Sequence, residues 1–291
     1  MTATASPHVE AFYDPQTGTL SYAVHDVATG ACAIIDAVLD FDARSGRTST
    51  QSADRIVGHV RAHKLNVLWL LETHAHADHL SAARYLQQQL GGIIGIGEAI
   101  RVVQDTFCSL YNLGASCPAD GSQFGHLFAA GETFAIGALA ATVMHVPGHT
   151  PADVAYVIDD RLAFVGDTLF MPDVGTARCD FPGGSAVTLY RSIRRLLDLP
   201  AATRVFVCHD YPPAGRAPAW ESTVAAQRAE NIHVRDGVSE ADFVAMRTGR
   251  DRTLAVPALM LPALQVNIRA GELPPAEDNG VRYLKIPLNA L

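Results

Sequence analysis

The chain has 291 residues, of which 48% are hydrophobic, so it holds enough apolar material for one large domain or two tightly packed halves. Lysine and arginine together number 22 against 30 aspartate and glutamate residues, which gives a formal net charge of −8. Because phosphate binding needs a concentrated basic face, this balance disfavours a nucleic-acid partner.

Neither the N-terminus nor the apolar runs carry a membrane signal. Residues 1–10 lack a basic stretch followed by an apolar one, and no apolar run reaches the roughly 18 residues that span a bilayer. Five cysteines, an odd number, form no CxxC pair: Cys32, Cys108, Cys117, Cys179 and Cys208. Free buried thiols are therefore favoured over a Cys108–Cys117 disulfide, and we expect a cytoplasmic protein without a membrane partner.

Short apolar runs alternate with stretches of helical periodicity along the chain. The runs predict buried strands at 20–24, 32–36, 67–71, 93–96, 140–144, 154–158, 162–165 and 204–207. The periodicity predicts helices at 52–63, 80–90, 185–197 and 239–249, the last beginning with a capping-box sequence. This alternation is typical of a layered α/β fold. From about Leu254 the Pro-rich sequence predicts an irregular, extended wrap over the second half.

Four potential metal ligands fall within six residues directly after the predicted strand 67–71. Residues two apart in an extended segment point to the same side, so His74, His76 and Asp78 can converge. A helical turn beginning near Asp78 would bring His79 toward the same space. Imidazole and carboxylate groups are ligands that borderline divalent metals prefer, so the motif predicts a metal site.

Three further candidate ligands each follow a predicted strand. His149 comes after 140–144, Asp167 after 162–165 and His209 after 204–207. A ligand just beyond a buried strand is held rigidly yet remains open to solvent and substrate. Each of these positions alone is typical of an ordinary turn. Together with the histidine motif they predict one centre assembled from four loops.

The ordered set of motifs resembles the metallo-β-lactamase-fold superfamily. The matching segments are Thr73-His74-Ala75-His76-Ala77-Asp78-His79, Gly148-His149, Gly166-Asp167 and His209. The resemblance implies an α/β fold, an αβ/βα four-layer sandwich of two similar halves with the metal at the edge between the sheets. We accordingly expect a single domain over 1–291, with a core of about 1–253 and a C-terminal wrap of about 254–291.

The same ligands have two uses within this superfamily. In its hydrolases, two cations such as Zn(II) lower the pKa of water for attack on a thioester, lactone or phosphodiester. The first cation would use His74, His76 and His149, the second Asp78, His79 and His209, and Asp167 would bridge them. In the other use, His74, His149 and Asp167 hold one Fe(II), and the remaining four residues orient them. Spacing does not choose between these uses.

Finer motifs resemble the persulfide dioxygenases, the group of the ethylmalonic-encephalopathy protein. These motifs are Gly166–Phe170, Arg178–Phe181 and His209–Tyr211. The resemblance implies oxidation of a glutathione-type persulfide by O2 to sulfite and thiol at one Fe(II) per chain, which is the main functional expectation. A two-metal hydrolase of the glyoxalase II, thioesterase or lactonase type is the alternative, although the Pro-rich tail looks unlike the helical C-terminal domain of glyoxalase II.

Several residues are candidates for roles beside the metal. Asp78, His79 and Tyr211 are candidate catalytic residues, with Asp78 expected to steady a neighbouring histidine. Arg178 can grip a substrate carboxylate, or instead form an ion pair with Asp180. Tyr211 can hydrogen-bond substrate, or simply pack. The loop 175–181 departs from the family pattern by a two-residue insertion and a cysteine, and the extra tail 265–275 is a candidate oligomer contact, for example in a homodimer.

Overall fold

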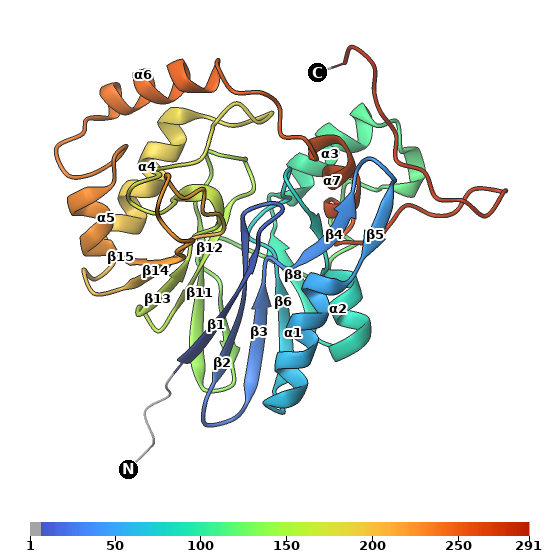
Figure 1. The fold of residues 1–291 in the computed structure, drawn as a ribbon, viewed down its shortest axis with the longest axis horizontal. Helices are drawn as coiled ribbons and strands as arrows, with labels where there is room; N and C mark the ends of the chain where they lie inside the picture. Colours follow the sequence, from blue (N-terminus) through green and yellow to red (C-terminus); the bar gives the residue numbers. More distant parts are fainter. Residues whose placement is uncertain (1–6, 291) are drawn as a thin grey trace.

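The computed structural model describes residues 7–290 and contains two six-stranded sheets packed face to face (Figure 1). In spatial order, the first sheet contains β1 (Pro7–Asp14), β2 (Thr19–Asp26), β3 (Ala31–Ile35), β6 (Asn66–Leu71), β8 (Ile93–Gly97) and β9 (His126–Phe128). The second contains β10 (Thr133–Ile136), β11 (Leu139–His145), β12 (Val154–Ile158), β13 (Leu162–Phe164), β14 (Arg204–Phe206) and β15 (Glu221–Thr223). A small third sheet joins β5 (Arg47–Ser49), β4 (Val38–Asp42) and β7 (Leu80–Ser81).

Helices cover the outer face of each large sheet (Figure 1). On the first sheet lie α1 (Gln51–Ala62), α2 (Ala83–Leu90), α3 (Ile100–Leu110) and α7 (Met260–Asn267). On the second lie α4 (Ala186–Leu197), α5 (Val224–Glu230) and α6 (Glu240–Asp251). The four-layer αβ/βα sandwich that the family resemblance implies is therefore confirmed.

Three clusters of buried apolar side chains hold the sandwich together, one between the two sheets and one between each sheet and its helices. Residues of both sheets, such as Ile35 and Tyr156, form the central one. The helices supply the outer two with one face each: α1 buries Ile56 and Val60, and α4 buries Ile193. Helices α1 and α4 thus turn an apolar stripe toward a sheet, which removes that stripe from water, while α6 packs on α4.

The strand directions bring four loops to one edge of the sandwich. Strand β6 runs parallel to its neighbours β3 and β8. In the second sheet β13 and β14 are parallel, and β11 shares their direction because β11 and β13 are both antiparallel to β12. The carboxyl ends of β11, β13 and β14 therefore meet at the same edge, where the loops 146–149, 165–168 and 207–211 begin.

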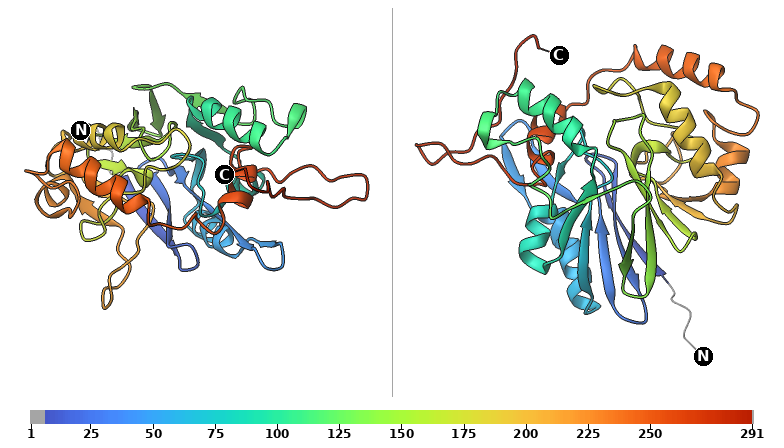
Figure 2. Two further views of the ribbon diagram at one scale, coloured as in Figure 1. Left: turned by 90° about the horizontal axis from the view of Figure 1, so that it is seen from above. Right: turned by 180° about the vertical axis from the view of Figure 1, so that it is seen from behind.

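The prediction for the C-terminal segment is wrong in two respects. Residues 260–267 form the helix α7 rather than an irregular stretch. This helix packs against β7 and α3, on the first half of the molecule and not the second (Figure 1, Figure 2). The reason is its composition, because α7 buries Met260, Leu264 and Val266, which need an apolar partner.

Two smaller expectations also need correction. Helix α2 begins at Ala83 rather than at residue 80, because Leu80 and Ser81 pair with Leu39 and Val38 of β4. Cys108 and Cys117 form a disulfide, since the chain turns back after α3 and brings their Cα atoms to 6.0 Å. The other three cysteines are free and buried. Within residues 7–290, no helix has the length and apolar character needed to cross a membrane.

Candidate metal centre

The four loops place their histidines and carboxylates in two adjoining groups. In the first group, ligand atoms of His74, His149 and Asp167 all lie within 4.8 Å of one another. In the second, ligand atoms of His76, Asp78, His79 and His209 do the same. The imidazole rings of His74 and His76 join the groups, with centroids 4.0 Å apart. The structure thus brings together all seven residues that the motifs predict.

Asp167 lies between the two groups. Its Oδ2 atom is 3.6 Å from Nε2 of His149, and its Oδ1 atom is 3.3 Å from Nε2 of His209. On the far side, Nε2 of His209 lies 3.2 Å from Oδ2 of Asp78. One carboxylate therefore faces both groups, which is the position that a bridging ligand requires.

Two glycines allow the ligand loops to approach so closely. Gly148 has a φ of 147°, and a Cβ there would lie 2.3 Å from the Cα of Leu189 in α4. Gly166 has a φ of 52°, and its Cβ would lie 2.7 Å from the hydroxyl of Thr73. Any side chain at either position would push His149 or Asp167 away from the centre.

Hydrogen bonds on the outer side fix the orientation of three imidazoles. Nε2 of His76 lies 3.0 Å from Asp36, and Nδ1 of His149 lies 2.8 Å from the carbonyl oxygen of Arg178. Nδ1 of His74 lies 3.1 Å from the hydroxyl of Thr73. Such contacts set the tautomer and direct the opposite nitrogen toward a metal.

The atoms on the inner side have no hydrogen-bond partner among the described residues. They are Nε2 of His74, Nδ1 of His76, Nε2 of His79, Nε2 of His209 and Oδ1 of Asp167. Leaving one buried polar atom unsatisfied costs about 1–3 kcal/mol, so five of them facing one small space are unfavourable without a ligand. Divalent cations satisfy imidazole nitrogens and carboxylate oxygens together, so these residues fit a metal centre.

The electrostatics of the site favour a neutral His74 and an ionised Asp78, whereas Asp167 and other carboxylates outweigh burial and raise the pKa of His149 and His209. Burial, and then the neighbouring histidines, lower the pKa of His74 well below its usual value. Burial opposes ionisation of Asp78, but the nearby His209 and His79 outweigh it and lower the pKa of that carboxyl. These are the protonation states in which both groups donate electron pairs to a cation.

A cavity of about 530 Å³ opens onto the centre at Asp78, His149 and Asp167. Tyr211, which is 51% exposed, lines it, and its ring stacks on that of His209 with centroids 5.7 Å apart. Arg178 lines it too, but its guanidinium donates to both carboxylate oxygens of Asp180, at 2.5 and 2.6 Å, and to the carbonyl of Ala255. The ion pair that we named as the alternative for Arg178 is therefore present.

Sequence reasoning missed several residues that hold the ligand loops. Asp36 directly follows β3, so the rule that found the other strand-end residues would have found it as well. Asn267 of α7 donates to the carbonyls of both His76 and His79 at 2.8 Å, and it accepts from the Ser81 amide at 2.7 Å. No local pattern marks Asn267, because its partners lie far away in the sequence.

Residues 15–209 match the family described as the Metallo-beta-lactamase superfamily, and the chain belongs to this family. A probable metallo-hydrolase of Burkholderia pseudomallei is 59% identical over 97% of this chain and 99% of its own length. Glyoxylase B2 of Dictyostelium discoideum is 51% identical over 97% of each chain.

Persulfide dioxygenase ETHE1 of Bos taurus is a more distant relative, 27% identical over 87% of each chain. Among solved structures, ETHE1 from Myxococcus xanthus superposes with a TM-score of 0.72 at 27% identity, covering 91% of this chain and all of its own. The chain is thus related both to proteins with hydrolase names and to persulfide dioxygenases, and it is a metal-dependent enzyme of this superfamily by fold and by site.

Proposed function

We propose that the protein is a binuclear metal-dependent hydrolase that cleaves an ester or thioester bond of a small anionic molecule. The observation that carries this proposal is the set of unpartnered ligand atoms, which occurs in both groups and not only around His74, His149 and Asp167. If one cation occupied the first group alone, Nε2 of His79 would stay buried without a partner. The hydrolase name of the 59% identical relative supports the same choice.

The residues divide between two cations as the hydrolases of the superfamily imply. His76, which lies in the second group but whose ring centroid is 4.0 Å from that of His74, would join His74 and His149 on one cation. Asp78, His79 and His209 would hold the other, with Asp167 between them. When bound, two divalent cations supply Lewis-acid polarisation of a carbonyl and lower the pKa of water. Asp36 keeps the ring of His76 in place through its hydrogen bond to Nε2.

The cavity supports an anionic substrate. Arg250 lines it and is exposed, and among residues 7–290 no ion pair or hydrogen bond engages its guanidinium. Phe170, Leu254 and Pro257 give the walls an apolar character. Arg250 would bind a carboxylate of a glutathione-type molecule in bidentate fashion while the reacting bond lies against the centre. Tyr211 would donate its hydroxyl to the substrate at the cavity mouth.

A second candidate is the persulfide dioxygenase that the finer motifs imply. The specific observation in its favour is the likeness to ETHE1, which extends over 91% of the chain. In this account one Fe(II) would be held by His74, His149 and Asp167, a set of two histidines and one carboxylate. The substrates would be a low-molecular-weight persulfide and O2.

One paired assay separates the two candidates. Metal-free protein is loaded with Zn²⁺ and given lactoyl-glutathione, and a second portion is loaded with Fe²⁺ without oxygen and given glutathione persulfide and O2. We expect thioester hydrolysis by the zinc form and no sulfite from the iron form. Oxygen uptake with sulfite release, combined with an inert zinc form, would replace the hydrolase by the dioxygenase. Asp167→Ala serves as the inactive control in both arms.

A further inference from the structure

A chain of three hydroxyl and carboxyl groups leads from the second ligand group to a separate cavity. The hydroxyl of Thr19 lies 3.4 Å from Nδ1 of His79 and 3.4 Å from Nδ1 of His209. Its other neighbour is the hydroxyl of Thr17, at 2.6 Å. Thr17 in turn donates to Oδ2 of Asp14 at 2.6 Å. One threonine thus contacts the outer nitrogens of two candidate ligands.

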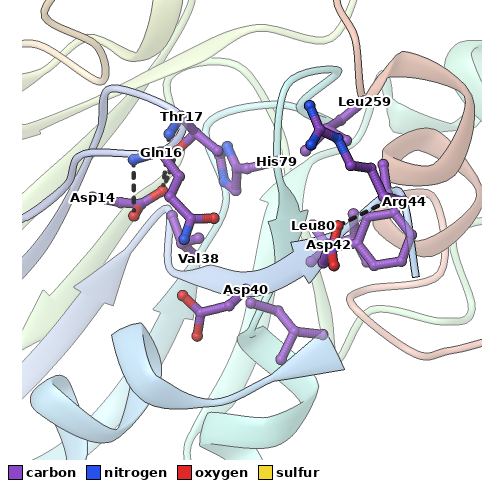
Figure 3. A pocket seen from close by; sticks show the side chains of 13 residues that line it. Asp14, Gln16, Thr17, Val38, Asp40, Asp42, Arg44, His79, Leu80 and Leu259 are labelled. Carbon is purple, nitrogen blue, oxygen red and sulfur yellow. Dashed lines mark hydrogen bonds between the residues drawn. The ribbon is translucent and has the colours of Figure 1, made fainter. Parts of the chain in front are cut away.

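The far end of this chain lies on the wall of a cavity of about 730 Å³. Figure 3 shows Asp14, Gln16, Thr17 and His79 around this cavity, with the hydrogen bonds to Asp14 dashed. Besides the Thr17 hydroxyl, Asp14 accepts from the backbone amides of Gln16 and Thr17. Three donors face this carboxylate, so it acts as an acceptor only.

Hydrogen counting then fixes the direction of every bond in the chain. A threonine hydroxyl has one hydrogen, and Thr17 uses its own toward Asp14. The hydrogen between the two threonines must therefore come from Thr19. Since Thr19 has no second hydrogen, it can only accept from His79 and His209.

We propose that Thr19 is a positioning residue that holds His79 and His209 with hydrogen on Nδ1, which leaves the Nε2 lone pair of each free for a cation. Both Nε2 atoms face the centre without a hydrogen-bond partner, as this role requires. Nδ1 of His79 also has Asp78 at 3.5 Å, a second acceptor that favours the same tautomer. A ligand held in one tautomer does not have to reorganise before it binds metal.

The backbone keeps Thr19 in register with His209. The two residues form an isolated antiparallel bridge, flanked by hydrogen bonds from the Leu20 amide to the Cys208 carbonyl and from the Asp210 amide to the Gly18 carbonyl. Thr19 is itself fully buried at the start of β2. Thr19 of the first sheet therefore helps to orient His209, a candidate ligand that follows β14 of the second sheet.

The role of Thr19 rests on cation binding by His79 and His209, not on which reaction the centre performs. Metal-free Thr19→Val protein is therefore titrated with Zn²⁺ against a chelator, beside wild type. We expect the affinity of the second cation to fall about 10–100-fold and that of the first to stay unchanged. Thr19→Ser, which keeps the hydroxyl, should restore it. Equal second-site affinity in Thr19→Val and wild type, or an equal loss at both sites, would overturn the proposal.

Nitrogen NMR of the metal-free protein gives an independent readout if only one cation binds. Wild type should show hydrogen on Nδ1 of His79 and His209, and Thr19→Val should show mixed tautomers. Thr17→Val is a milder substitution, because Thr17 lies in a half-buried turn. It removes the acceptor of the Thr19 hydroxyl, so the hydrogen of Thr19 can turn toward His79 or His209. Rings of both histidines that carry hydrogen on Nε2 but not on Nδ1 in wild type would contradict the assignment, whatever the metal content.

Discussion

Asp36 and His76 form a buried pair in which a carboxylate oxygen of Asp36 lies 3.0 Å from Nε2 of His76, so that Nδ1 of His76 faces the ligand groups. Asp36 also accepts from the amide and the hydroxyl of Thr73, which precedes the first ligand. One carboxylate therefore orients a ligand and fixes the start of its loop.

Replacing Asp36 should weaken metal binding, although the replacement removes none of the ligand atoms that face the metal. We expect Asp36→Ala to lower the affinity for the first cation roughly 10–100-fold, since the ring of His76 loses its outer partner. Zinc competition with a chelator measures this. Asp42→Ala is the matched control, because Asp42 lies in an exposed turn. An affinity of Asp36→Ala equal to that of Asp42→Ala would refute the role.

Asn267 should couple the C-terminal helix to the stability of the ligand loop. Asn267→Leu leaves two buried carbonyls and the Ser81 amide without partners. Because each buried group left unsatisfied costs about 1–3 kcal/mol, we expect the free energy of unfolding, measured with urea, to fall by at least about 3 kcal/mol. The exposed Asn279→Leu should change little. A stable Asn267→Leu protein would mean that the loop does not depend on α7.

Arg250 should select for charge on the substrate. For an anionic thioester, Arg250→Ala should raise KM about tenfold or more with little change in kcat, since a hydrogen bond to a charged group contributes about 1.5–3 kcal/mol. Steady-state kinetics with a neutral ester of similar size should show no such change. Arg252→Ala, an exposed residue outside the cavity lining, is the control. Equal effects on charged and neutral substrates would rule out an anion contact.

His233 should make the fold less stable in mild acid. Burial, followed by the charges of Arg247 and Arg250, lowers the pKa of His233 from 6.5 to about 4. Above pH 6.5 the ring is neutral in both states, and as the pH falls toward 4 only the unfolded chain binds the proton, so stability declines. In His233→Asn, whose amide oxygen can still accept from Thr176, the melting temperature should fall less over that interval. Equal falls in melting temperature between pH 6.5 and pH 4 in wild type and His233→Asn would contradict this.

The ligand loops were predictable because each candidate ligand comes shortly after a predicted buried strand. His74, His149, Asp167 and His209 each follow a run of buried apolar residues, and strand direction alone then gathers their loops at one edge. The outer contacts were not predictable in this way. Thr19 and Asn267 reach the site from β2 and α7, and their neighbours in the sequence carry no pattern that reports a distant partner.

The C-terminal helix shows how a local rule fails. The Pro-rich sequence favoured an irregular tail because proline breaks helix interiors, and one of its prolines is Pro262. It lies in the first turn of α7, where backbone amides have no partner within the helix, so it costs little there. The helix is also buried on most sides, which removes the amphipathic stripe that the search for periodicity needs.

The zinc content of the reconstituted protein tests the binuclear centre most directly. Wild type is loaded with Zn²⁺, freed of excess metal and measured by elemental analysis beside His79→Ala and His149→Ala. We expect two zinc ions per chain in wild type and one in each variant, since each removes a ligand from one group. A single ion in wild type that His79→Ala retains would show that the second group holds no metal, and the hydrolase account would fail.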